Sequence, residues 1–339
     1  MNEELRNRRF VLKRRPESGL RPEDFALENA AVPDLADGQF LIANHFASID
    51  PAMRGWLDDR PSYLPPVPLG AAMRAGTIGK VVASRTDAMP VGTWIKGINT
   101  IEEYSVGSAG DGNRPIDPTR VTSMSQYISV AGGASLTAWV GVHRILMPQP
   151  GETLLVSSAA GAVGSVSGQL AKRLGARVIG IAGGAEKCSR LTQEFGFDAA
   201  IDHRNRDYAG MRAAIREAAP DGLDMVFENV GGAGLDAALS CLAKHARIAL
   251  CGLISEYNGP AVGARSLKEL IFRSGTMHGF TLLDFPDDLL PATDALLTAA
   301  ERGDIRFAEQ IEHGIENAFA TISQLFEGGT SGKLILQIA

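Results

Sequence analysis

From residue 153 to residue 252 the chain alternates short apolar runs with amphipathic stretches, and this alternation constrains the fold more than any other feature. The apolar runs include TLLVSSA, RVIGIA, DMVFENV and RIALCG. Nearly continuous apolar strands separated by amphipathic helices are typical of a parallel sheet that helices cover on both faces. We therefore expect an α/β domain in this part of the chain.

The first 130 residues have a different pattern. They are rich in proline and glycine and contain β-like runs such as FLIANHFASI, AGTIGKVVAS and GTWIKGI. This predicts an irregular β domain with turn-rich connections, in which residues 108–119 form an exposed loop. Helical patterns over 286–302 and 315–326 and a final β-like run, KLILQI, follow the alternating region. A chain of 339 residues is longer than one compact core usually needs, so two domains are expected.

Charge, hydropathy and cysteine content narrow the class of protein. The net charge of −6 argues against a general nucleic-acid-binding protein. The basic segment RNRRFVLKRR is compatible with a polyanion contact or, as we favour, with an edge strand guarded by charges. No run approaches the roughly 18 apolar residues of a membrane span, and residues 1–20 lack the apolar core of a secretory signal. Three widely spaced cysteines without a CxxC pair predict no disulfide framework, and a cytoplasmic location fits best.

A glycine-containing turn joins the first predicted strand of the alternating region to the first helix. Residues 159–164, AAGAVG, fit the pattern A-x-G-x-x-G. Small residues there let backbone amides approach a pyrophosphate, and the helix N-terminus supplies positive potential. The apolar residues that follow recur at helical spacing, as expected for a helix packed on the sheet, at Val163, Val166, Leu170 and Leu174. The sequence therefore predicts a dinucleotide-binding turn.

The end of the second predicted strand indicates which dinucleotide binds. NAD enzymes usually carry an Asp or Glu there, which accepts a hydrogen bond from the ribose 2′-hydroxyl. In this chain the strand ends in IAGG, residues 181–184, without a carboxylate. Lys187 follows closely, and its positive charge suits a 2′-phosphate. The neighbouring carboxylate of Glu186 is instead the residue type that favours NAD. The sequence predicts NADP(H) as the cofactor.

Several longer words resemble one family. SAAGAVGSVSGQLAK, AGGAEK, GFDAAIDH, ENVGG and CGLISEYN, with SIDPAMRGWLDDRPSYLPPVPLG upstream and GGTSGKLIL downstream, are similar to the zinc-independent medium-chain dehydrogenases/reductases. Within that superfamily they resemble the prostaglandin reductase/leukotriene B4 dehydrogenase branch, and most of all the bacterial NADPH-dependent curcumin/dihydrocurcumin reductases. The matching words are spread over nearly the whole chain.

The resemblance implies both a fold and an activity. It implies a GroES-like substrate domain from residues 1–130, completed by residues 303–339, and a Rossmann-like, doubly wound NADP-binding domain from residues 131–302. It implies NADPH-dependent reduction of the carbon–carbon double bond of α,β-unsaturated ketones or aldehydes, in a homodimer. A small apolar conjugated carbonyl compound is then the expected substrate, with no nucleic-acid or membrane partner.

The resemblance also assigns cofactor residues by position. The pyrophosphate turn would be Gly161, Ala162, Val163 and Gly164, and the 2′-phosphate site would be Gly183, Lys187 and His203, the last where many relatives have tyrosine. The remaining cofactor-binding residues would be Asn229, Gly252, Leu253, Ile254, Ser255, Tyr257, Phe280 and Thr330. Ala52 and Trp139 stand where relatives commonly have tyrosine, and Thr330 where they have asparagine. These departures imply retained cofactor use and an altered substrate pocket.

The expected chemistry requires a hydrogen-bond donor. Hydride transfer to the β-carbon of an enone places negative charge on the carbonyl oxygen, and the α-carbon then needs a proton. The chain lacks a GHE word and the cysteine–histidine ligand spacing of zinc alcohol dehydrogenases, so no metal is expected. Tyr257, just beyond a predicted strand end, is the first candidate donor, and Tyr63 in a proline-rich loop is the second, because a phenol with a pKa of about 10 stays protonated. The ribose hydroxyl or a water can serve instead.

Aromatic residues suggest the character of the pocket. If they converge, the following would give an apolar cleft that suits a flat conjugated ketone: Met53, Trp56, Tyr63, Trp139, Tyr257 and Phe280. Two alternatives remain open at this point. One is an NADPH quinone oxidoreductase on the same scaffold, and the other is a non-catalytic NADPH-binding protein.

Overall fold

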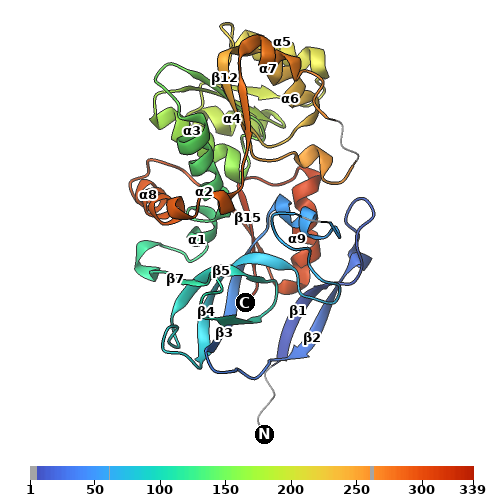
Figure 1. The fold of residues 1–339 in the computed structure, drawn as a ribbon, viewed down its shortest axis with the longest axis vertical. Helices are drawn as coiled ribbons and strands as arrows, with labels where there is room; N and C mark the ends of the chain where they lie inside the picture. The colour runs from blue at the N-terminus through green and yellow to red at the C-terminus, as the bar shows by residue number, and fades with distance from the viewer. Residues whose placement is uncertain (1–5, 61, 260–262) are drawn as a thin grey trace. The chain divides into compact units, whose positions relative to one another are not determined.

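The computed structural model describes residues 6–60, 62–259 and 263–339. It divides into two compact units (Figure 1). The first unit combines residues 1–132 with residues 309–339, and the second unit is the continuous segment 133–308. Segments far apart in the sequence therefore share the first unit, while the second is made from one stretch of chain.

The second unit is built on a parallel sheet. Its strands lie in the order β10-β9-β8-β11-β12-β13, and every neighbouring pair is parallel. Their bounds are β8 Thr153–Val156, β9 Arg177–Ala182, β10 Ala199–Asp202, β11 Leu223–Glu228, β12 Leu242–Leu250 and β13 Thr276–Gly279. In chain order this is 3-2-1-4-5-6, the doubly wound arrangement whose order reverses between the first and fourth strands. The predicted α/β class with a doubly wound parallel sheet is confirmed.

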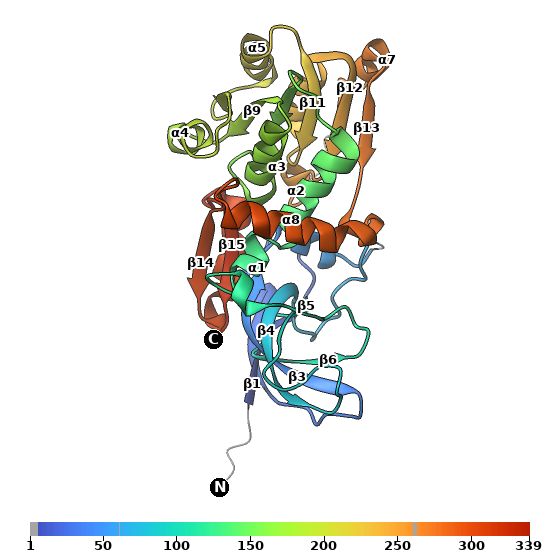
Figure 2. The ribbon, with the colours of Figure 1, turned by 90° about the vertical axis from the view of Figure 1, so that its left-hand side faces the viewer.

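Helices connect and cover these strands. The connecting helices are α3 Ala162–Arg173, α4 Ala185–Gln193, α5 Tyr208–Ala218, α6 Gly232–Leu239 and α7 Lys268–Arg273. The helix α2, Gly133–Val140, packs beside α3 and contacts α8, Leu289–Glu301 (Figure 2). The helix α5 packs beside α6.

Both faces of the sheet are buried at its central strands β8, β9 and β11, which explains their nearly continuous apolar sequences. Val226 belongs to a core cluster with Met211 of α5 and Leu235 of α6. The next residue, Phe227, points to the opposite face because side chains alternate along a strand. There it meets Gly141 of the π-helix η4, Gly141–Leu146, so closely that a Cβ on Gly141 would lie 2.8 Å from Cζ of Phe227 and nearer still to Cε2.

The first unit is rich in β-structure. One sheet has the order β14-β15-β3-β4-β5-β7, with β6 on β3, and β1 pairs with β2 in a separate antiparallel ribbon. The strands are β1 Arg6–Leu12, β2 Phe25–Ala31, β3 Gln39–Ser48, β4 Arg74–Ser84, β5 Trp94–Thr100, β6 Tyr104–Ser108, β7 Arg114–Pro115, β14 Glu309–His313 and β15 Lys333–Gln337. The helices are α1 Gln126–Ser129 and α9 Ala318–Glu327. Lys333 is buried at the start of β15, and its Nζ donates 2.7 Å hydrogen bonds to the Ile49 carbonyl and to Asp50 Oδ1.

The basic N-terminal segment forms β1 and the residues after it. Arg8 pairs with Glu103 at 2.9 Å, and Arg9 pairs with Glu102 at 3.1 Å. Lys13 reaches a third carboxylate, that of Glu28. Charges that are already paired within the chain favour the charge-guarded strand over the polyanion contact. By contrast, the loop predicted at 108–119 is interrupted by the short strand β7.

No helix in the described ranges is both long enough and apolar enough to cross a membrane. The same ranges contain no group of three or more histidine, cysteine, aspartate or glutamate side chains placed to hold a metal ion.

Candidate cofactor and active site

The turn after β8 has the geometry of a phosphate cradle. Ser158 has a φ of 49°, and the N–H of Gly161 donates to the Ser158 carbonyl at 3.0 Å. The helix α3 begins at Ala162, and no side chain caps its N-terminus. The first N–H groups of a helix have no acceptor within it, so this end offers backbone donors and positive potential to an anion.

Gly164 explains why this turn needs a glycine. A Cβ built there would lie 2.8 Å from the Cα of Ala159 and nearer still to the carbonyl oxygen of Ser158. Both neighbours are backbone atoms, which cannot move aside without changing the turn. The close approach of helix and turn therefore depends on the missing side chain. The residues present fit a bound pyrophosphate.

The end of β9 brings three of the predicted 2′-phosphate residues into one region. A Cβ on Gly183 would come within 2.9 Å of His203 Nε2, so the imidazole lies against this glycine. Lys187 stands in the first turn of α4, which starts two residues after Gly183. Burial lowers the pKa of Lys187, with Glu186 acting in the opposite direction.

Two further residues lie at this strand end that the sequence patterns did not predict as site residues. Asp202 ends the neighbouring strand β10, and its Oδ1 accepts a hydrogen bond from the Gly184 N–H at 2.9 Å. Arg204 pairs with the same carboxylate at 3.1 Å. The word AAIDHR contained both, but their importance follows from the pairing of β10 with β9.

A buried carboxyl group, that of Glu228, links the ends of β8 and β11, the two neighbouring strands between which the strand order reverses. Oε1 of Glu228 accepts hydrogen bonds from Ser157 Oγ at 2.9 Å and from the N–H groups of Val230 and Gly231. Asn229 donates from its backbone N–H to Ser157 Oγ and from Nδ2 to the Ser157 carbonyl, at 2.8 and 2.7 Å. Burial raises the pKa of Glu228, and the hydrogen bonds it accepts oppose that rise. These contacts tie Asn229 to the strand ends that border the crevice of a doubly wound sheet.

The loop after β12 continues this edge. The N–H of Ile254 donates to the Asn229 carbonyl at 3.2 Å, and both the N–H and the Oγ of Ser255 donate to the Val230 carbonyl. Tyr257 follows the 3₁₀ helix η5, Ile254–Glu256. A Cβ on Gly252 would lie 3.3 Å from its phenol oxygen. The structure therefore brings together, beside the ends of β11 and β12, the predicted residues Asn229, Gly252, Leu253, Ile254, Ser255 and Tyr257.

The ring of Phe280 packs against Phe227. Phe280 directly follows β13, is 9% exposed, and its ring meets Phe227 edge-on at 6.4 Å between centroids. Tyr63 and Thr330 belong to the first unit, and their part in the site stays a prediction. Tyr63 is 48% exposed. Burial lowers the pKa of Arg74, and the interaction of Arg74 with Tyr63 opposes that shift.

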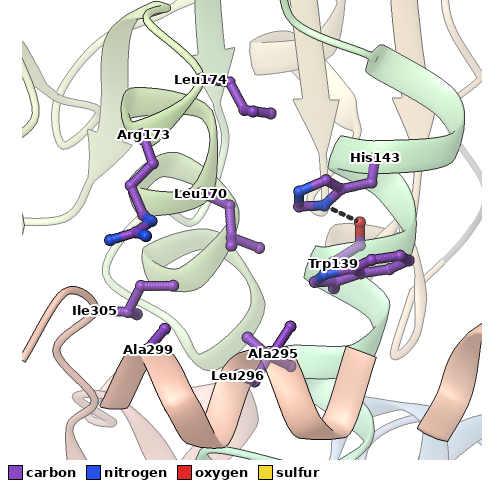
Figure 3. A pocket seen from close by; sticks show the side chains of 9 residues that line it. All are labelled: Trp139, His143, Leu170, Arg173, Leu174, Ala295, Leu296, Ala299 and Ile305. Carbon is purple, nitrogen blue, oxygen red and sulfur yellow. Dashed lines mark hydrogen bonds between the residues drawn. The ribbon is translucent and has the colours of Figure 1, made fainter. Parts of the chain in front are cut away.

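Three members of the proposed aromatic cleft have other surroundings. Met53 and Trp56 are buried in the core of the first unit. Trp139 stacks on His143 at 4.5 Å and lines a cavity of about 290 Å³ between α2, η4, α3 and α8 (Figure 3). That cavity is lined by Trp139, His143, Leu170, Arg173, Leu174, Ala295, Leu296, Ala299 and Ile305. The expectation that all six residues share one cleft is wrong for Met53 and Trp56. Both side chains are buried against other residues of the first unit's core, so they have little surface left to line a cleft.

Family models match both units of the chain. Residues 8–115 match the N-terminal domain of oxidoreductase, and residues 162–298 match a zinc-binding dehydrogenase domain. The second match contains the glycine turn, the β9 end and the loop after β12.

Full-length relatives carry more specific names. The NADPH-dependent curcumin reductase of Escherichia coli strain K12 is 37% identical, over 98% of this chain and 97% of that protein. Prostaglandin reductase 1 of Rattus norvegicus is 32% identical, over 97% of this chain and 98% of its own. The crystal structure of CurA in complex with NADPH from Vibrio vulnificus is 34% identical and superposes with a TM-score of 0.91, covering 98% of this chain and 99% of that one.

Proposed function

Because the chain belongs to the zinc-independent medium-chain dehydrogenases/reductases, in their curcumin reductase and prostaglandin reductase branch, we propose that it reduces the carbon–carbon double bond of α,β-unsaturated ketones and aldehydes. It is an NADPH-dependent oxidoreductase that acts on CH–CH bonds. The observation that carries the proposal is the glycine turn before α3, which fits a pyrophosphate within a chain that aligns end to end with NADPH-dependent reductases.

Each part of the cofactor is assigned its own group of residues at the carboxyl ends of the parallel strands. The first turn of α3, from Gly161 to Gly164, would hold the pyrophosphate. Gly183, Lys187 and His203 would surround the adenosine 2′-phosphate. Asn229, the loop 252–257 and the backbone of Phe280 would border the nicotinamide end. When bound there, NADPH supplies the hydride for the reaction.

Tyr257 is proposed as the donor to the substrate oxygen. As the double bond is reduced, that oxygen gains negative charge, and a neutral phenol can donate a hydrogen bond to it. The hydroxyl of Tyr257 lies against Gly252, two residues beyond the C-terminal end of β12, and this supports the proposal because doubly wound enzymes bind ligands outside the carboxyl ends of their strands. Tyr63 is the second candidate, and the α-carbon proton would come from one of these phenols, a ribose hydroxyl or a water.

We also propose a homodimer. The strand β13 ends the order of the parallel sheet, so one of its edges lacks a partner strand among the described residues. The helix α7, which precedes β13 in the chain and packs on β12, exposes Ile271 to 78% and Phe272 to 63%. An open strand edge next to exposed apolar side chains is a surface that a second copy can cover. Light scattering should find a dimer that Ile271→Glu with Phe272→Glu converts to a folded monomer; a wild-type monomer would contradict this proposal.

The reaction itself is tested with purified protein and NADPH. Loss of NADPH absorbance is followed with curcumin, a 2-alkenal, an aryl enone, a quinone and a plain ketone, and the products are identified by mass. The proposal expects turnover of the enones and the alkenal to saturated carbonyl compounds. Turnover of the quinone alone would make the protein a quinone oxidoreductase. NADPH binding without turnover of any acceptor would favour a non-catalytic role.

A further inference from the structure

A carboxylate lies at the nucleotide-binding end of β9, although β9 itself does not supply it. Asp202 ends β10 and is the register partner of Ala182, the last residue of β9. Its Oδ1 accepts hydrogen bonds from the N–H of Gly184 at 2.9 Å and from the N–H of Arg204 at 3.0 Å. In NAD enzymes a carboxylate near this strand end accepts from the ribose 2′-hydroxyl. Asp202 offers the same chemistry from the neighbouring strand.

Arg204 forms an ion pair with the carboxylate of Asp202. Its Nη2 lies 3.1 Å from Asp202 Oδ2, and its Nε lies 3.3 Å from each carboxylate oxygen. The hydrogen bonds from Arg204 hold the pKa of Asp202 far below its usual range, with the Gly184 N–H adding to the effect. The carboxylate therefore stays ionised while its charge is compensated. Without Arg204 it would present an uncompensated negative charge at the place proposed for the 2′-phosphate.

The backbone at Gly184 makes room for the guanidinium. A Cβ on this residue would lie 2.7 Å from Arg204 Nη2 and 2.8 Å from Cζ, and its φ of 95° also favours glycine. Arg204 thus lies directly over the start of α4, with its side chain 58% exposed. Its Nη1 makes no hydrogen bond to the part of the chain that the structure describes. A guanidinium has five N–H donors, so it can hold a carboxylate and still bind a phosphate.

We infer that Asp202 and Arg204 together select the coenzyme: Arg204 binds the adenosine 2′-phosphate, and Asp202 rejects that phosphate whenever Arg204 does not neutralise it. The inference rests on the proposed function, because it concerns the NADPH of that reaction. The inference makes Arg204 a second positively charged residue at the proposed phosphate site, besides Lys187. It also explains how a carboxylate is tolerated next to a 2′-phosphate. It also predicts that the same carboxylate, once uncovered, serves NADH.

The test uses binding rather than turnover. NADPH and NADH are titrated into the full chain, and nucleotide fluorescence reports the two dissociation constants. Arg204→Ala should weaken NADPH binding by about tenfold or more, since it removes charge-assisted hydrogen bonds and uncovers Asp202. NADH binding should become about twofold to fivefold tighter, because the carboxylate can now accept from the ribose hydroxyl. Arg204→Lys should fall between wild type and Arg204→Ala, because lysine keeps the charge and loses the planar fork.

A double variant separates the two roles. Arg204→Ala with Asp202→Asn should lose the gain in NADH affinity and regain part of the NADPH affinity, because the repelling charge is gone. Arg206→Ala is the matched control. Its Nε donates to the backbone carbonyl of Asp202 rather than to the carboxylate, so it should leave the ratio of the two constants unchanged. Titrations with adenosine 2′,5′-bisphosphate and 5′-AMP should show the same differences without the nicotinamide.

The outcomes distinguish this inference from the function beneath it. A wild-type protein with no preference for NADPH would overturn both. A wild-type preference that survives Arg204→Ala would overturn the inference alone, as would an equal loss in Arg206→Ala. Circular dichroism of each variant confirms that the chain has folded before binding is compared.

Discussion

Gly164 and Ala159 approach so closely that a Cβ on the glycine would lie 2.8 Å from the Cα of the alanine. Gly164→Ala is therefore expected to distort the turn and lower the free energy of unfolding by about 1–3 kcal/mol. NADPH binding should weaken by about tenfold or more because the backbone donors are displaced. Urea unfolding and NADPH titration measure the two effects.

Gly234 on α6 provides the control for that substitution. A Cβ there would meet nothing within 4 Å, and its helical position favours alanine. Gly234→Ala should bind NADPH normally and gain up to about 1 kcal/mol of stability. If Gly164→Ala also binds NADPH normally, the turn does not hold the pyrophosphate.

Lys187→Ala should raise the KM for NADPH by about tenfold while changing the KM for NADH by less than about twofold, since only NADPH carries the 2′-phosphate. Initial rates at saturating enone measure both constants. Lys172→Ala removes a lysine that pairs with Asp198 at 2.9 Å and should affect neither. Equal increases for the two coenzymes would remove Lys187 from the phosphate site.

Tyr257→Phe should lower kcat for an enone by about tenfold to a hundredfold, because a donor to the developing oxyanion is lost. The dissociation constant for NADPH should stay the same, since the ring itself is kept. Tyr208→Phe, at an exposed position on α5, is the matched control. An unchanged kcat in Tyr257→Phe would assign the donor to another group, with Tyr63→Phe as the next variant.

Glu228 should make stability depend on pH in an unusual direction. Burial raises its pKa in the folded chain. An acid of this kind contributes its full stability below its unfolded-state pKa of about 4.3 and loses that contribution as pH rises through the folded-state pKa. Glu228→Gln keeps an oxygen acceptor for Ser157, Val230 and Gly231 but cannot titrate. Its stability should therefore fall less than that of the wild type over this range.

Urea unfolding at a series of pH values measures this difference. Glu217→Gln removes an exposed carboxylate on α5 and should reproduce the wild-type profile. Parallel profiles for the wild type and Glu228→Gln would show that the buried carboxyl does not titrate in this range.

Apolar periodicity and small turn residues correctly predicted the strand β9 and the start of the helix α3. The run RVIGIA coincides with β9, and the helix expected after AAGAVG begins at Ala162. Both follow from apolar periodicity and from small residues at a turn, which neighbouring residues determine. The fold class could be predicted for the same reason.

Contacts between distant strands could not be predicted in this way. The carboxylate of Asp202 reaches Gly184 only because β10 pairs with β9, and strand order is a property of the whole sheet. The strand β13 was missed because its sequence, TMHG, has no apolar alternation and pairs with β12 through backbone hydrogen bonds. Phe280 joins the core through Phe227, a contact that no local pattern contains.

The position of β15 between β14 and β3 has a consequence for synthesis. The segment 133–308 is continuous and can collapse around its own sheet as soon as it leaves the ribosome. Residues 1–132 emerge earlier but must wait for residues 309–339, because β3 has no β15 and Asp50 has no Lys333 until then. The unit that begins to be translated first is therefore completed last, and until then β3 has an open strand edge that can pair with other chains.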